Sequence, residues 1–288
     1  MFDDILVPTD GSENSLAALD HALLLAEAFD ATIHGLYVVN VTYAADFEGG
    51  LDGDAVYEVM EREGEEALET IAERCDEAGV EVATDSLVGR PAHRITEYAE
   101  EADVDLVAMG THGRSGVARL LLGSVTEAVL RRSDRTVLTI PKDARPPIAG
   151  YEDVMVASDG SDDSGTAVDR AIELAVAFGS MLHGLYVVDA SFTHEGIVED
   201  ILTGEGDRVT ADIEGRGTEA GLGVSTSIAE GEPHEEIVDY ATEHDVDVIV
   251  LGSHGKGAIE RTVLGSVSER TVRLATQPVM VVRDATDR

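Results

Sequence analysis

The chain has 288 residues, of which 43% are apolar and 27% charged, and its formal net charge is −38. So acidic a chain has little to neutralise phosphates along a duplex, which excludes nucleic acid as an expected partner. It has no charged-then-apolar leader and no apolar run long enough to cross a bilayer, so we expect a cytoplasmic protein without a membrane partner.

The acidic residues are spread through helical patterns such as EREGEEALETIAERCDEAG at 61–79 rather than gathered in one tail. Such a surface repels itself in dilute buffer, and at about 1 M salt the screening length falls to about 3 Å. We therefore expect a folded, halophilic protein from a salt-rich cytoplasm. Cys75 is the only cysteine, which excludes an internal disulfide.

The first half of the chain alternates short apolar runs with longer helical patterns. Ile5-Leu6-Val7 is typical of a strand buried on both faces. A helical stripe follows at Leu16, Leu19, Leu23 and Ala26. The later elements are a strand at 33–39, a helix at about 55–78, a strand at 80–88, a helix at 91–102, a strand at 104–109, a loop, a helix at 123–132 and a strand at 136–140. Five strands separated by helices predict an α/β fold with a parallel, doubly wound sheet, whose ligands bind where the strand order reverses.

The second half of the chain repeats the first. The segment DILVPTDGSENS at 4–15 matches DVMVASDGSDDS at 153–164, an offset of 149 residues. HGLYVV occurs at 34–39 and again at 183–188, with the same offset. GRPAHRI at 89–95 matches GEPHEEI at 231–237 only 142 residues later, so the second copy is seven residues shorter between these segments. Length differences between repeats usually lie in surface loops.

The two copies are separated by PKDARPPIAG at 141–150, which has three prolines and no hydrophobic period. This composition is typical of a linker. The sequence therefore predicts two tandem five-stranded domains, 1–141 and 151–288, joined by a linker at 142–150.

A glycine pattern also occurs twice: GTHGRSGVARLLLGS at 110–124 and GSHGKGAIERTVLGS at 252–266. Gly110 and Gly113 allow a tight turn and a close approach of backbone to a ligand. Gly123 and Ser124 stand where the next helix should begin, and the free N–H groups and dipole of a helix start favour an anion. Ser124 either caps that helix or donates to a phosphate. Gly252, Gly255, Gly265 and Ser266 repeat the pattern.

Charged and titratable residues accompany each pattern. Arg114 and Lys256 follow the second glycine and either add to a local positive field or are solvated loop cations. Three roles are open for Asp10 and Asp159: each accepts a hydrogen bond from a ribose hydroxyl, holds a metal through water, or only caps the next helix. His112 and His254 touch a phosphate or donate to backbone. No nucleophile and base recur as a pair in both copies, so no catalytic residue is assigned.

An early strand ending in PTDGS, then GRPAHRI, then MGTHG with nine residues to GSV, resembles the universal stress protein family, twice and over nearly the whole chain. The resemblance implies Rossmann-like domains of the adenine nucleotide alpha-hydrolase type that bind ATP (or AMP or ADP) with Mg²⁺. The implied ATP-binding positions in the first copy are Pro8, Thr9, Asp10, Val38, Met109, Gly110, Gly113, Arg114, Gly123, Ser124, Val125 and Thr126. The matching positions in the second copy are Ala157, Ser158, Asp159, Val187, Leu251, Gly252, Gly255, Lys256, Gly265, Ser266, Val267 and Ser268.

Asp10 and Val38 would face ribose and adenine, whereas the glycine loop would follow the phosphates. The change from Pro8-Thr9 to Ala157-Ser158 is expected to alter the loop near the base. In this family the last strand commonly pairs two domains across a dyad. The resemblance therefore implies an intramolecular pseudo-dimer of the two repeats and leaves a further homodimer open.

Three functions stay open. The first is an ATP-binding regulatory or stress-protective protein with slow hydrolysis at most. The second is an adenylate-forming or ATP-hydrolysing enzyme of the adenine nucleotide alpha-hydrolase type, although its SGGxDS-like loop is here TDGSENS and SDGSDDS. The third is an interaction module that binds no nucleotide. The presence of the glycine pattern in both repeats argues against it. The Walker and GxGxxG patterns are absent.

Overall fold

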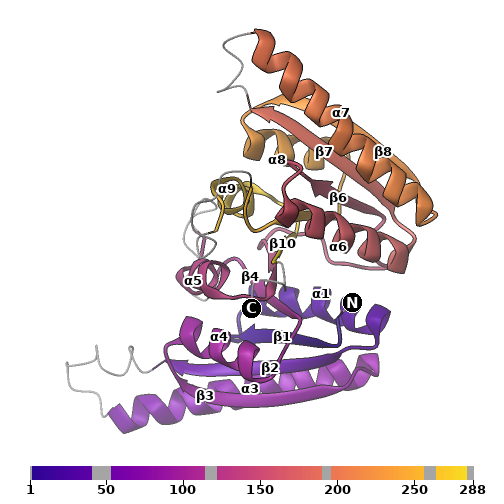
Figure 1. Ribbon diagram of the computed structural model, residues 1–288. Helices are drawn as coiled ribbons and strands as arrows, with labels where there is room; N and C mark the ends of the chain where they lie inside the picture. The colour runs from indigo at the N-terminus through magenta and orange to yellow at the C-terminus, as the bar shows by residue number, and fades with distance from the viewer. Residues whose placement is uncertain (1, 41–52, 114–121, 190–195, 256–263, 284–288) are drawn as a thin grey trace. The chain divides into compact units, whose positions relative to one another are not determined.

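The computed structural model describes residues 2–40, 53–113, 122–189, 196–255 and 264–283. These residues form two compact units, Met1–Lys142 and Asp143–Arg288. Each unit is an α/β domain with a parallel sheet (Figure 1). None of the helices in the described part of the chain has the length and apolarity that crossing a bilayer requires.

Unit 1 contains five strands and four helices among its described residues. In chain order they are β1 (Asp4–Thr9), α1 (Glu13–Phe29), β2 (Thr32–Asn40), α3 (Gly53–Ala78), β3 (Val82–Gly89), α4 (Pro91–Glu101), β4 (Leu106–Gly110), α5 (Ser124–Arg132) and β5 (Thr136–Ile140). The sheet order is β3-β2-β1-β4-β5, so the order reverses between β1 and β4. In the register, Ile5 pairs with Ile33 on one side and with Leu106 on the other.

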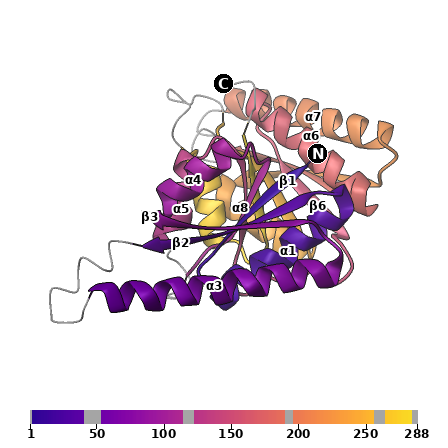
Figure 2. The ribbon, with the colours of Figure 1, turned by 90° about the horizontal axis from the view of Figure 1, so that it is seen from below.

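Helices cover both faces of this sheet. Helix α1 lies beside α3 on one face, and α4 lies beside α5 on the other (Figures 1 and 2). Because both faces are covered, the middle of β1 is a continuous apolar run, and its residues Ile5, Leu6 and Val7 are fully buried. Gly35 lets α3 approach β2 closely, since a Cβ there would lie 3.1 Å from Ile71.

Unit 2 repeats the fold. Its elements are β6 (Asp153–Ala157), α6 (Asp162–Phe178), β7 (Met181–Asp189), α7 (Gly196–Glu219), β8 (Val224–Gly231), α8 (Pro233–Glu243), β9 (Val248–Gly252), α9 (Ser266–Leu274) and β10 (Val279–Val282). Its strand order is β8-β7-β6-β9-β10, which is the order of unit 1. The parallel, doubly wound, five-stranded fold predicted for each repeat is confirmed.

The first residue of the repeated HGLYVV segment has a structural role in both units. The ring of His34 bonds Asp4 Oδ1 through Nε2 at 2.8 Å and the Tyr98 hydroxyl through Nδ1 at 3.0 Å. In unit 2, the ring of His183 makes the same two bonds, at 2.9 and 3.1 Å, to Asp153 and Tyr240. Each histidine thus ties two neighbouring strands to the helix that follows the third strand.

One detail of the predicted pattern is wrong. The stripe expected on α1 included Leu16 and Leu23, but both are only half-buried. The fully buried positions of α1 include Ala18, Ala22 and Leu25. Leu19 and Ala26 of the expected stripe are buried, and the helix packs against β1 and β4.

Candidate functional site

The turn after β1 is closed by its own side chains. Gly11 has a left-handed φ of 74°, and its N–H donates to Thr9 Oγ1 at 3.0 Å. The N–H of Ser12 donates to Asp10 Oδ1 at 3.1 Å. Ser12 is the N-cap of α1, and its hydroxyl accepts from the N–H of Ser15. The expectation that Asp10 caps the helix is therefore corrected: Ser12, two residues later, is the cap, and Asp10 holds the turn that precedes it.

Unit 2 builds the same turn. Gly160 has φ 75° and donates to Ser158 Oγ at 3.1 Å, and the N–H of Ser161 donates to Asp159 Oδ1 at 3.0 Å. Ser161 caps α6 as Ser12 caps α1. The change from Pro8-Thr9 to Ala157-Ser158 keeps the hydroxyl that this turn needs, so the hydrogen bonds of the loop are unaltered.

The glycines after β4 are positions without room for a side chain. A Cβ on Gly113 would lie 2.6 Å from Asp10 Oδ2, and one on Gly123 would lie 2.9 Å from the carbonyl oxygen of Thr111. A Cβ on Gly110 would overlap the side-chain amide of Asn14. The carboxylate of Asp10 and the glycine loop therefore lie against each other, where the strand order reverses.

The second loop has the same crowding. A Cβ on Gly255 would lie 2.7 Å from Asp159 Oδ2, and one on Gly265 would lie 3.1 Å from the carbonyl oxygen of Ser253. The Gly265 N–H donates to that carbonyl at 2.8 Å, as the Gly123 N–H donates to Thr111 at 2.7 Å.

Helix α5 begins without a side-chain cap. Its N-cap is Gly123, no side chain within the described residues makes a capping hydrogen bond, and Ser124 is already its first helical residue. The alternative in which Ser124 caps the helix is therefore wrong. The Thr126 hydroxyl donates to the Gly110 carbonyl at 2.8 Å, which holds the helix start against the end of β4.

Helix α9 begins in the same way. Its N-cap is Gly265, which has no side chain to make a capping hydrogen bond, and the Ser268 hydroxyl donates to the Gly252 carbonyl at 2.7 Å. Helices α1 and α6, which start at the same edge of their sheets, are closed by serine. Helices α4 and α8 also lack a side-chain cap, but each begins on a proline, Pro91 or Pro233, which has no N–H to donate. In each unit the helix after the glycine loop therefore combines an uncapped start with free donors for an anion.

The remaining expected positions differ in exposure. Val38, Val125, Val187 and Val267 are half-buried, as is Ala157, whereas Ser124 and Ser266 are exposed. Met109, Leu251 and Pro8 are buried. Arg114 and Lys256 lie outside the described residues.

The sequence reasoning missed one pair of residues, Asn14 and Asp163. Asn14 Nδ2 donates to the His112 carbonyl at 3.0 Å. Asp163 Oδ2 instead lies 3.2 Å from His254 Nδ1. Both residues stand inside the matched DGSENS and DGSDDS segments, 149 residues apart, so the repeat offset was the signal that could have found them.

The loop histidines bond side chains rather than backbone. His112 Nδ1 lies 3.0 Å from the Thr111 hydroxyl, and His254 Nδ1 lies 2.9 Å from the Ser253 hydroxyl. Among the described residues, Nε2 of each ring is buried and has no hydrogen-bond partner. An orphaned buried nitrogen at this position suits a ligand oxygen.

A sequence profile of the Universal stress protein family matches residues 1–141 and again residues 150–283. The chain belongs to the universal stress protein family.

Relatives in this family match one repeat or both. A universal stress protein of Methanocaldococcus jannaschii is 39% identical over 142 residues, which is 49% of this chain and 84% of that protein. One from Mycolicibacterium smegmatis is 26% identical over 298 residues and covers 97% of this chain and 96% of its own. The crystal structure of a universal stress protein from Archaeoglobus fulgidus aligns with TM-score 0.75 at 27% identity, over 99% of this chain and 98% of that one. The tandem arrangement is thus shared with other universal stress proteins.

The residues present in this universal stress protein fit a nucleotide. Each unit has a cradle that a Cβ would fill, an uncapped helix start and an orphaned histidine nitrogen. A metal cage made only of protein is a poorer fit, since the described residues contain no group of three His, Cys, Asp or Glu placed to hold an ion. Mg²⁺ usually binds through one or two carboxylates together with phosphates and water, which leaves a role for Asp10 and Asp159 only beside a nucleotide.

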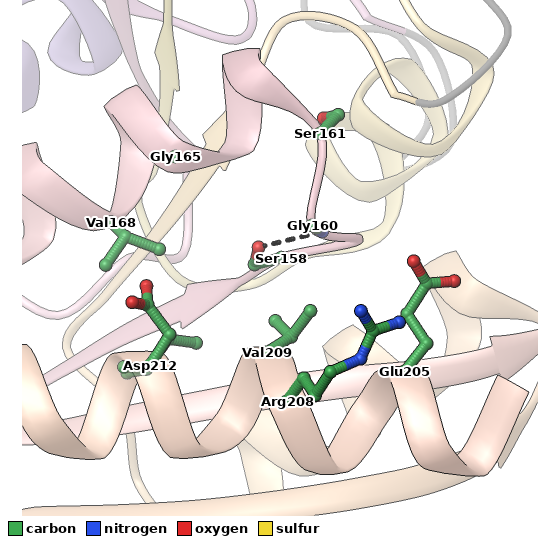
Figure 3. Close-up of a pocket in the computed structure, with 10 residues that line it drawn as sticks. Ser158, Gly160, Ser161, Gly165, Val168, Glu205, Arg208, Val209 and Asp212 are labelled. Carbon is green, nitrogen blue, oxygen red and sulfur yellow. Dashed lines mark hydrogen bonds between the residues drawn. The ribbon is translucent and has the colours of Figure 1, made fainter.

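A cavity of about 260 Å³ adjoins the turn of unit 2 (Figure 3). It lies between the Ser158–Ser161 turn and α7, with Arg208 and Asp212 on the helix side and Gly165 and Val168 on the α6 side. The positions of Gly165 and Val168 carry Leu16 and Leu19 in the first repeat. The loss of the Leu16 side chain at Gly165, together with the smaller side chain of Val168, leaves space on this side of the second turn.

Proposed function

We propose that this universal stress protein binds ATP in both units and acts in stress protection or regulation through that binding, with slow hydrolysis at most. The proposal includes Mg²⁺ carried by the nucleotide, a cytoplasmic setting, and pairing of the two repeats as an intramolecular pseudo-dimer.

The observation that carries the proposal is the contrast, in each unit, between the first helix and the helix that follows the glycine loop. Serine closes α1 and α6, whereas α5 and α9 start on glycine with no side-chain cap, directly after the glycine loop. In a chain of net charge −38, a polyanionic ligand needs a local positive field. Backbone N–H groups at an uncapped helix start supply one without adding a charged side chain.

The aspartates supply the opposite end of the site. Asp10 keeps one oxygen on the Ser12 N–H and presents the other toward Gly113, and Asp159 does the same toward Gly255. A carboxylate at that place would accept a hydrogen bond from a ribose hydroxyl. That bond would orient the nucleotide with its phosphates along the glycine loop. Val38 and Val187, near the carboxyl ends of β2 and β7, would offer apolar contact to the base.

An enzymatic function would need a nucleophile and a base in register. Ser253, His254 and Asp163 have the composition of a catalytic triad, but Ser253 Oγ and Asp163 Oδ2 both approach the same ring nitrogen, Nδ1 of His254. A triad uses one nitrogen for the carboxylate and the other for the nucleophile. The first repeat has Asn14 in place of the carboxylate. Binding is therefore favoured over catalysis.

Calorimetry of the full chain in molar KCl with ATP and Mg²⁺ tests the proposal, together with mass spectrometry of nucleotide released on denaturation. We expect two ATP equivalents per chain. Gly123→Val and Gly265→Val should each remove one, because a side chain there meets the loop carbonyl. Gly204→Ala is the matched control, since its Cβ meets nothing within 4 Å and it lies on α7.

Absence of both binding and retained nucleotide in the unmodified protein would refute the proposal. Substrate-dependent release of pyrophosphate would instead support the adenylate-forming alternative.

A further inference from the structure

We propose that the two nucleotide sites differ in the charge of the nucleotide that they accept. The second site takes ATP as its magnesium complex and discriminates against free ATP, whereas the first accepts both more evenly. The determinant is Asp163, which stands where the first site has Asn14. This inference rests on the proposed function and concerns the same sites.

Both residues lie at the beginning of the glycine loop. Asn14 is the second residue of α1, 6% exposed, and its amide contacts Gly110 and the His112 carbonyl. Asp163 is the second residue of α6, and its side chain is 24% exposed. A Cβ on Gly252 would lie 3.1 Å from the Asp163 carbonyl oxygen, so the residue packs on the end of β9 as Asn14 packs on the end of β4.

The exchange adds a negative charge at this position and replaces the hydrogen bond to the His112 carbonyl by a contact with His254. The flanking acidic positions are kept, with Asp10 matched by Asp159 and Glu13 by Asp162. The first turn of α1 therefore holds one acidic residue, and the first turn of α6 holds two. Because the Asp163 carboxylate is mostly buried, solvent and salt screen it less than an exposed group.

His254 packs against this carboxylate, and its Nδ1 lies 3.2 Å from Asp163 Oδ2. In the first site, Asn14 instead donates to the His112 carbonyl.

Free ATP and magnesium-ATP differ in net charge, and a carboxylate in the site responds to that difference. Free ATP carries about four negative charges near neutral pH, and one bound Mg²⁺ removes about two of them, so a nearby carboxylate repels the free form roughly twice as strongly. The same carboxylate tolerates the magnesium complex. A site with asparagine in its place lacks this added discrimination.

The test compares the ratio of the dissociation constants of free ATP and magnesium-ATP at each site. Gly265→Val leaves the first site, and Gly123→Val leaves the second. Each protein is titrated by calorimetry at one fixed pH and one fixed KCl concentration, once with ATP in EDTA and once with ATP and excess MgCl₂. We expect the ratio at the second site to be about tenfold larger than at the first.

Reciprocal exchange provides the decisive control. Asp163→Asn in the second-site protein should lower the ratio to the value of the first site, and Asn14→Asp in the first-site protein should raise it. The two side chains have nearly the same shape. If circular dichroism shows that one exchange unfolds the protein, the other still decides.

Equal ratios at the two sites, or ratios that the exchanges leave unchanged, would overturn the inference while leaving ATP binding intact. A complete lack of binding in the unmodified protein would remove the proposed function and the inference together.

Discussion

At the scale of single residues, Cys75 is a thiol that is fully buried. It lies on α3 with none of its surface exposed, and burial raises the pKa of its thiol to about 11. The thiolate is the reactive form of cysteine, so a raised pKa suppresses its chemistry at neutral pH.

We therefore expect Ellman's reagent at about pH 8 to react with Cys75 at least a hundredfold more slowly in the folded than in the unfolded protein. The same raised pKa means that the unfolded thiol loses its proton first as pH rises. Stability should thus fall between the ordinary thiol pKa and about 11, and be unaffected by this group below that window. Equal labelling rates in folded and unfolded protein would contradict the burial.

At the scale of elements, α7 is unusual in carrying several glycines with different surroundings. A Cβ on Gly204 meets nothing within 4 Å, whereas one on Gly206 would lie 2.8 Å from the ring of Tyr186. Glycine inside a helix costs roughly 1 kcal/mol relative to alanine.

Gly204→Ala should therefore raise the free energy of unfolding of unit 2 by about 1 kcal/mol. Gly206→Ala, two residues along the same helix, should give no gain or a loss, because the helix and β7 would have to separate. Urea denaturation followed by circular dichroism measures both. A gain of the same size from both substitutions would show that helix–sheet distance is not set at Gly206.

The elements were predictable from sequence because their signals are local or repeated. Apolar runs placed the strands, and the shared offsets identified the second copy. What was missed depends on contacts between distant residues: Asn14 meets His112 across 98 positions, and Asp163 meets His254 across 91. The cap was also missed, because Asp-Gly-Ser offers two residues able to close a helix, and the direction of the chain leaving β1 decides between Asp10 and Ser12.

At the scale of the whole molecule, the net charge of −38 dominates the expected behaviour in solution. Exposed glutamates stand one turn apart along α3 at Glu65, Glu69 and Glu73. Like charges at this spacing destabilise a helix, and added salt screens them.

The thermal unfolding midpoint should therefore rise steeply as KCl increases from about 0.1 M to about 1 M, where the screening length falls from about 10 Å to about 3 Å. Changing Glu65, Glu69 and Glu73 together to glutamine should raise the midpoint at low salt and leave it nearly unchanged at high salt. Scanning calorimetry at several KCl concentrations measures this difference. A midpoint independent of KCl in both proteins would rule out charge repulsion as the limiting factor.

The strand order also affects how the chain folds during its synthesis on the ribosome. Every strand of the first sheet lies within Met1–Lys142, so unit 1 contains all it needs before unit 2 is synthesised. At about 5–20 residues per second, the ribosome needs roughly 7–30 s to add the second unit. Misassembly between similar repeats is a known hazard of repeat proteins. Here the order of translation completes all five strands of unit 1 before β6 is synthesised.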